Sequence, residues 1–293
     1  MAARKKPSAR VELTRLLAGR VTTKNADQVY TLALALFEEI TFAARPTEAS
    51  FHLMARGFEA AAARGHAAAW LDLGRCRWNG WGVPEDREAA LEAYTTSAEL
   101  GSVEGAYAAA YNLYWVFEEY PAAHHYACLA LGGGDPTGGV HYLLGLMAFH
   151  GRGCPASLSE SVARHKAAAA RENLDAMFEL YVLFSTGQGV RKNERRAREW
   201  LWKAAEGGHP RATYNLGAFY ATGNGVEKDA RAAVKWYGRS SSAGNARASA
   251  TLGAMYLLGD GVRKDARRSR EHLARARAQG MDTDAFLDAV GAR

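Results

Sequence analysis

The sequence predicts an all-α protein, a solenoid of about seven antiparallel helix hairpins, and two observations support this. A loop of the form GxGV, or GRGC in one copy, recurs five times, and its last four copies start 36 residues apart. Ala is abundant, only 7 Pro are present and no long β-branched run occurs, which favours helix. Self-similarity at this period indicates stacked supersecondary units. The loops lie at Gly80–Val83, Gly151–Cys154, Gly187–Val190, Gly223–Val226 and Gly259–Val262.

Each repeat contains the signals that end one helix and begin another. In the repeat that contains the loop Gly223–Val226, the first helix is expected at about residues 211–222, where the GxG loop ends it, because Gly tolerates the left-handed conformation. Three residues after each loop stands a residue type that favours an N-cap, so a second helix is expected to begin there. These positions are therefore assigned to capping and not to catalysis. They are Asp86, Ser157, Asn193, Asp229 and Asp265.

The second helix of each repeat shows columns of small and bulky residues at helical spacing. Small residues let neighbouring helices approach closely, and bulky ones fill the space between them. The small columns are Ala90, Ser161, Ala197, Ala233 and Ser269, then Ser97, Ala168, Ala204, Ser240 and Ala276. The bulky column is Tyr94, His165, Leu201, Tyr237 and Leu273. In the first helix, Leu-Gly recurs at 73–74, 144–145, 216–217 and 252–253, and we expect these glycines to contact the paired helix.

The combined pattern, A–x3–LG–x2–Y–x2–GxGV followed by a cap and A–x2–WY–x2–AA–x2–G, resembles the Sel-one-like repeat family. This family is the 36-residue relative of the tetratricopeptide repeat. The resemblance covers about residues 27–280 and implies a right-handed solenoid that binds proteins. The expected division is a basic, partly disordered tail at 1–26, a single solenoid at 27–280, and a short capping helix with a tail at 281–293. Within the solenoid, the hairpins at 27–65 and 102–135 lack the full motif.

No pattern of catalytic or metal-binding residues stands out. Five His in the middle third scatter over two repeats without the spacing of a zinc site. The glycine-rich segment at 132–139 lacks the Lys-Ser/Thr of a phosphate loop and is interpreted as a turn. No G-x-S-x-G segment occurs. We therefore expect a protein that is not an enzyme and has no catalytic residue, metal or cofactor.

The resemblance also indicates a candidate binding surface. In the tetratricopeptide pattern, the first helices line the concave side, and transferring those positions gives a set rich in aromatic residues. Aromatic and Arg side chains dominate the binding energy of many interfaces. The alternative, packing of the same side chains against the next repeat, stays open. The candidate residues are Arg75, Trp78, Tyr107, Tyr111, Tyr114, Tyr142, Phe149, Phe178, Arg211 and Tyr214.

Charge and composition limit the class of partner. The net charge of +6 comes mainly from Arg-rich segments near the C-terminus and from the N-terminal tail. Glu and Asp interrupt these segments, which favours a solvated helix face over a nucleic-acid site. Three Cys without regular pairing indicate no disulfide framework. No apolar stretch approaches the roughly 20 residues of a membrane span, and no secretory signal is recognised, so a cytoplasmic location is expected.

The expected function is that of a cytoplasmic adaptor or scaffold that binds a protein or peptide in an aromatic-lined concave groove. The sequence leaves the oligomeric state open, and a monomer is the favoured interpretation. One alternative is a dedicated inhibitor or immunity protein that blocks one cognate toxin or enzyme. The other alternative is a nucleic-acid-binding protein that uses the basic C-terminal helices. This interpretation is less favoured, because Glu and Asp interrupt the basic segments.

Overall fold

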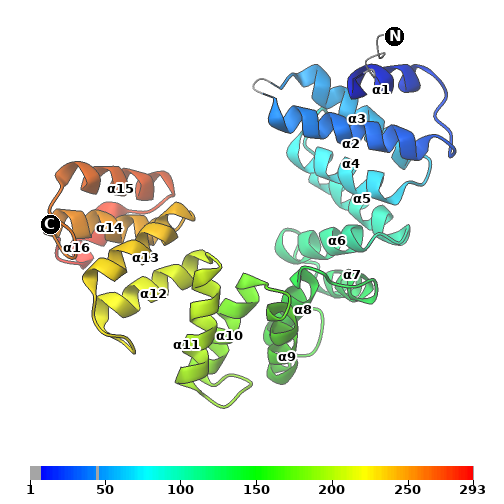
Figure 1. Ribbon diagram of the computed structural model, residues 1–293. Helices are drawn as coiled ribbons and strands as arrows, with labels where there is room; N and C mark the ends of the chain where they lie inside the picture. The colour runs from blue at the N-terminus through cyan, green and yellow to red at the C-terminus, as the bar shows by residue number, and fades with distance from the viewer. Residues whose placement is uncertain (1–7, 44–45, 293) are drawn as a thin grey trace, which may run out of the picture. The chain divides into compact units, whose positions relative to one another are not determined.

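The computed structural model describes residues 8–43 and 46–292, and these residues form helices and connecting loops with no strand (Figure 1). The predicted all-α class is confirmed. Contacts within the chain define two compact units, residues 1–156 (unit 1) and 157–293 (unit 2).

Unit 1 contains three antiparallel hairpins, α2–α3, α4–α5 and α6–α7, preceded by α1 and followed by α8. The hairpin at 27–65 is thus a real pair of helices although its loop motif has degenerated. The bounds are α1 (Ala9–Ala18), α2 (Ala26–Phe42), α3 (Glu48–Ala62), α4 (Ala67–Asn79), α5 (Arg87–Glu99), α6 (Val103–Trp115), α7 (Tyr120–Gly132) and α8 (Gly139–His150).

Unit 2 begins with α9, continues with the hairpins α10–α11, α12–α13 and α14–α15, and closes with the short α16, which lies where a capping helix was predicted. The bounds are α9 (Leu158–Ala169), α10 (Leu174–Thr186), α11 (Glu194–Glu206), α12 (Pro210–Thr222), α13 (Ala230–Ser242), α14 (Ala246–Leu258), α15 (Ala266–Ala278) and α16 (Thr283–Ala289).

The two glycines of each GxG loop have different tasks. The first ends the preceding helix in the left-handed conformation, as Gly187 does at φ 82°. The second places the loop against the previous repeat: a Cβ at Gly189 would lie 2.5 Å from the backbone oxygen of Leu158, at the start of α9. Gly261 makes the equivalent approach to Ala230 at the start of α13. The loop therefore fixes the contact between neighbouring repeats as well as the end of a helix.

All five predicted N-caps are confirmed. The side chain of each accepts a hydrogen bond from the backbone N–H three residues later, as Asp86 does from Ala89 at 2.9 Å and Asn193 from Arg196 at 2.9 Å. These side chains satisfy amide groups that would otherwise lack a partner at the helix start.

The predicted columns of the second helices form the core. Every residue of the two small columns and of the bulky column is buried. The mid-helix glycines fit against the bulky column, since a Cβ at Gly217 would lie 2.8 Å from the ring of Tyr237, and one at Gly253 would lie 2.7 Å from Leu273. The close approach of paired helices explains why Gly recurs at this position despite its low helix propensity.

The N-terminal segment differs from the tail expected at 1–26. Residues 9–18 form α1, whose Leu13 is fully buried against α2 and α3. The spacing of Leu13, Leu16 and Leu17 is that of one helix face, which explains why this segment packs. Residues 1–7 lie outside the described residues.

Candidate functional site

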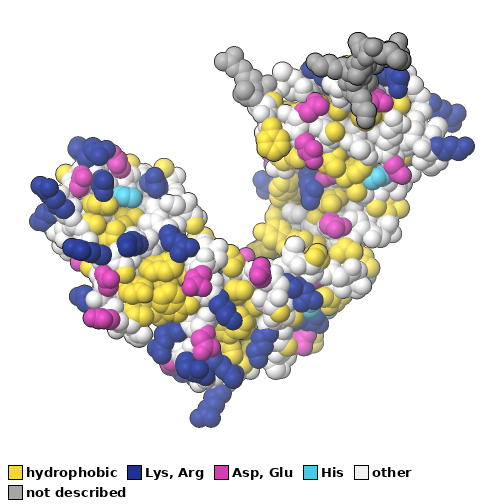
Figure 2. Space-filling view, in the orientation of Figure 1, with side chains coloured by type: hydrophobic (Ala, Val, Ile, Leu, Met, Phe, Trp, Pro, Cys, Tyr) yellow, Lys and Arg dark blue, Asp and Glu magenta, His cyan; other side chains and the backbone are white. Residues whose placement is uncertain are grey.

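An aromatic ladder runs along one face of α6 in unit 1. Tyr107, Tyr111 and Trp115 follow one another at a spacing of four residues, with ring centroids 6.2 Å and 6.4 Å apart. Tyr111 is 46% exposed and Trp115 is 48% exposed. Figure 2 shows hydrophobic side chains at the surface in the region where Figure 1 places α4 to α6. Large aromatic side chains with this exposure are candidates for contact with a partner.

The opposite face of α6 explains why the ladder lies at the surface. Ala106, Ala109 and Ala110 are buried together with Leu113, so the helix approaches its neighbours through small residues. The hydroxyl of Ser102 accepts a hydrogen bond from the N–H of Gly105 at 3.0 Å and fixes the start of α6. One face of α6 is therefore used for packing, and the aromatic face remains available.

A pocket of about 460 Å³ lies beside the ladder. The α7–α8 turn closes one side of it and is held by Asp135, which accepts a hydrogen bond from the backbone N–H of His141 at 2.8 Å. Most of its lining is apolar or aromatic, which suits a partner's hydrophobic side chain. The lining comprises Arg75, Val103, Glu104, Tyr107, Ala108, Tyr111, Asn112, Gly134, Asp135, Pro136, Thr137 and Val140.

Arg75 stands at the edge of this pocket and is oriented by a polar network. Its guanidinium donates to the carboxylate of Asp72 at 2.8 Å, and Asp72 also accepts a hydrogen bond from the hydroxyl of Tyr30 at 3.0 Å. Burial, followed by the charge of Asp72, raises the pKa of Tyr30 to about 12, so the hydroxyl stays protonated and donates. Arg75 is still exposed, and its remaining N–H groups can reach a partner.

The structure brings Arg75, Tyr107 and Tyr111 together at the pocket and places the other candidates of unit 1 elsewhere. Trp78 is half-buried, with the guanidinium of Arg87 5.3 Å from its ring, and Tyr142 and Phe149 are half-buried on α8. Tyr114 is 2% exposed and packs between the rings of Trp115 and Tyr120. Tyr114 therefore belongs to the core and not to the exposed face of α6.

The candidates of unit 2 belong to a contact between hairpins. Phe178 is 3% exposed, stacks on His209 at 4.8 Å, and has the guanidinium of Arg211 4.3 Å from its ring. The Nδ1 atom of His209 accepts from the N–H of Ala212, so Nε2 donates to Asp175 at 3.1 Å. This hydrogen bond lowers the pKa of Asp175. Phe178 thus joins α10 to α12 from the interior.

Tyr214, the remaining candidate, is half-buried on α12. Its ring lies 5.2 Å from that of Tyr237, with the guanidinium of Arg247 5.7 Å away on the other hairpin. Of the candidates in unit 2, only Arg211 is exposed.

Other chemical features are few. In residues 8–43 and 46–292, no group of three or more His, Cys, Asp or Glu lies close enough together to hold a metal ion. None of the helices in this part of the chain is both long and apolar enough to cross a membrane. On α7, the exposed Cys128 lies 3.8 Å from the ring nitrogens of His124.

Comparison with known proteins supports the repeat assignment. The family model described as "Sel1 repeat" matches residues 67–102, 140–170, 174–209, 210–245 and 246–281. None of the curated proteins matches the chain.

Several solved structures are similar. A protective antigen present in uropathogenic Escherichia coli strains, which displays an SLR fold, is 28% identical with a TM-score of 0.62; the match covers 78% of this chain and 49% of the antigen. The chain thus spans about half the length of that protein. A Sel1 repeat protein from Oxalobacter formigenes is 22% identical with a TM-score of 0.65, over 98% of this chain and 95% of that one.

An immunity protein from Pseudomonas aeruginosa is 21% identical over 89% of this chain and 84% of that one, with a TM-score of 0.36.

Proposed function

Because the chain belongs to the Sel1 repeat family, we propose that it is a non-enzymatic protein-binding module, a cytoplasmic adaptor or scaffold, which holds a protein or peptide on the aromatic face of α6. One observation carries the proposal. Tyr111 and Trp115 expose nearly half of their surface beside an apolar pocket of about 460 Å³. Rigid aromatic side chains next to a pocket that accepts an anchor are typical of binding hot spots.

The polar groups around the pocket would orient the partner. Arg75 and Glu104 carry opposite charges on two different helices, α4 and α6, and both line the pocket. A bound segment would place an apolar side chain in the pocket and its polar groups against this pair. Because both side chains are exposed, the pair should contribute more to specificity than to affinity.

Replacing Tyr111 and Trp115 together by Ala should weaken binding of the partner at least 30-fold, since loss of a hot spot costs about 2 kcal/mol or more. The experiment is a pull-down from native cytosol with the wild type and this double variant. The captured protein is then purified, and its dissociation constant is measured for both.

A matched control replaces Leu257 and Leu258, two exposed apolar residues of α14, by Ala. The control should bind as the wild type does, and circular dichroism should show all three proteins folded. Equal affinity of the Tyr111→Ala/Trp115→Ala variant and the wild type would contradict the proposal. The identity of the partner distinguishes an adaptor from an inhibitor of one toxin or enzyme.

A further inference from the structure

Two pockets in unit 2 occupy the same place in different repeats. The first, of about 450 Å³, is lined by Phe184, Arg191 and Arg196, and the second, of about 510 Å³, by Tyr256, Arg263 and Arg268. Corresponding residues are separated by 72 positions, which is two repeats. We call them the first and second basic pockets. They lie on unit 2 and share no residue with the aromatic site of unit 1.

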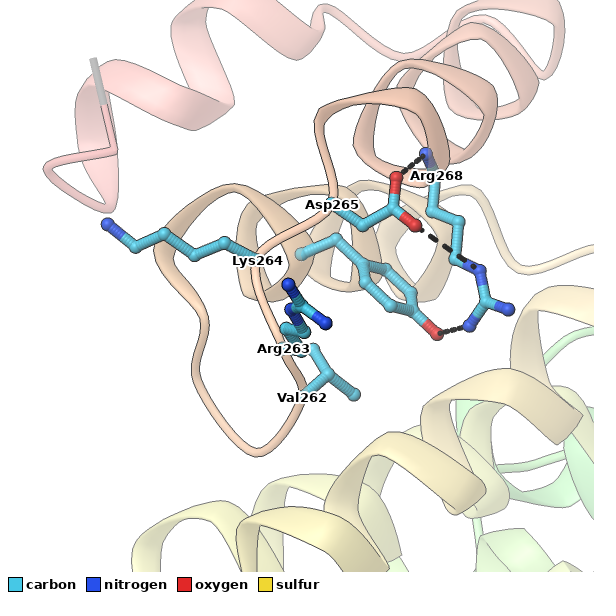
Figure 3. A pocket seen from close by; sticks show the side chains of 6 residues that line it. Val262, Arg263, Lys264, Asp265 and Arg268 are labelled. Carbon is cyan, nitrogen blue, oxygen red and sulfur yellow. Dashed lines mark hydrogen bonds and ion pairs between the residues drawn. The ribbon is translucent and has the colours of Figure 1, made fainter.

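Each basic pocket combines an aromatic ring with two Arg side chains. The guanidinium of Arg196 lies 5.9 Å from the ring of Phe184, and that of Arg268 lies 5.6 Å from the ring of Tyr256. In the second pocket, Arg268 also donates to the hydroxyl of Tyr256 at 3.2 Å (Figure 3). An Arg held against an aromatic ring is restrained, so less side-chain entropy is lost when it binds an anion.

The second Arg of each pocket is free to bind. Within the described residues, no ion pair or hydrogen bond engages the guanidinium of Arg191 or Arg263, and both are exposed. Lys264 extends away from Arg268 and leaves Arg263 as the nearer cation (Figure 3). Asn193 and Asp265 accept amide hydrogens at the starts of α11 and α15, so the positive charge of the pockets comes from side chains. Asp265 also pairs with Arg268 at 3.6 Å, which leaves Arg263 as the Arg of the second basic pocket that has no carboxylate partner in the part of the chain that the structure describes (Figure 3).

The surrounding unit is basic and would attract an anionic partner. Unit 2 carries 23 Lys and Arg against 15 Asp and Glu, whereas unit 1 carries 14 against 16. Figure 2 shows Lys and Arg side chains spread over the region of α13 to α15. A positive field of this kind raises the rate of encounter with acidic partners.

The intervening repeat indicates which kind of anion fits. There Glu227 stands where the basic pockets have Arg191 and Arg263, and Ala232 stands where they have Arg196 and Arg268. A continuous polyphosphate would have to pass Glu227, which repels it, whereas two separate acidic clusters would not. We propose that unit 2 binds an acidic segment of a protein, with one cluster of carboxylates at each basic pocket.

The test uses the full chain and fluorescently labelled peptides, followed by fluorescence anisotropy. One peptide carries two clusters of three Glu joined by a Gly/Ser linker, made in a series of lengths, and the other carries a single cluster. The two-cluster peptide should bind about 100-fold more tightly than the single cluster, with a maximum at one linker length, because two fixed sites are filled together. No dependence on linker length would overturn the proposal.

Variants assign the binding to the pockets. Each basic pocket is removed in turn by a double variant, Arg191→Ala/Arg196→Ala for the first and Arg263→Ala/Arg268→Ala for the second. Either variant should bind the two-cluster peptide no more tightly than the single-cluster peptide. The control Arg231→Ala/Lys235→Ala removes the same amount of charge from exposed positions of α13. This control should still bind the two-cluster peptide more tightly than the single cluster. An equal loss in the control would mean that only net charge is recognised, which overturns the proposal.

Two further probes distinguish an acidic protein segment from other anionic ligands. Tighter binding of single-stranded DNA of equal charge, or binding of a doubly phosphorylated peptide but not of the Glu peptide, would also contradict an acidic segment as the ligand. The Tyr111→Ala/Trp115→Ala variant should bind the Glu peptides as the wild type does, so this test is independent of the site in unit 1.

Discussion

Replacing Gly189 by Ala should lower the free energy of unfolding by about 3 kcal/mol. Gly189 has φ of 69°, a conformation that costs an L-residue about 1–2 kcal/mol. The new Cβ would also lie 2.5 Å from the backbone oxygen of Leu158, so α9 or the loop must move. Overpacking of this kind costs about 1–3 kcal/mol more. Urea denaturation followed by circular dichroism measures the loss.

Gly208→Ala is the matched control. Gly208 also has positive φ, at 93°, but nothing lies within 4 Å of a Cβ built there. Its replacement should cost only the conformational strain, about 1–2 kcal/mol. If the two variants lost the same stability, the second glycine of the loop would not be needed for contact between repeats.

The stability of the protein should fall by about 3 kcal/mol between pH 7 and pH 4 because of His165 alone. Burial in the core lowers the pKa of His165 to about 4, whereas the unfolded chain has the ordinary value near 6.5. Above pH 6.5 both states are neutral and the residue has no effect. As the pH falls from 6.5 to 4, the unfolded state takes up the proton, and each pH unit costs about 1.4 kcal/mol.

His165→Leu should flatten this part of the pH profile. The same column holds Leu201 and Leu273, so Leu fits the position. The difference between wild type and variant, measured by urea denaturation at pH 7, 6, 5 and 4, isolates the contribution of one imidazole. Parallel profiles for the two proteins would show that His165 is protonated within the fold.

The local features of the repeat could be predicted from the sequence because they depend on residues a few positions apart. A cap such as Asp229 and its partner Ala232 lie within one turn, and the glycine that ends a helix lies next to that helix. The contact of Gly189 with Leu158 cannot be predicted from the spacing within one repeat, because it joins two repeats. Helix α1 was also missed, although the spacing of Leu13 and Leu17 carried a signal.

The exposure of the candidate residues could be predicted only in part. Tyr111 and Tyr114 are three residues apart on α6, yet one is exposed and the other is buried, because the packing of α7 decides which side of α6 is covered. Phe178 is covered in the same way by His209 of the next hairpin. Transferring positions from a regular repeat does not predict such contacts, because they depend on the neighbouring helices. The pocket was not predicted, because it needs the irregular turn around Asp135.

The most direct test of the proposed binding site is photo-crosslinking from a single position. A photoreactive phenylalanine analogue is placed at Tyr111, and in a separate sample at Leu257, which is exposed on α14. After irradiation with the purified partner, mass spectrometry identifies the linked peptides. We expect a cross-link from position 111 to one segment of the partner and none from position 257. A cross-link from 257 without one from 111 would contradict the proposed binding site.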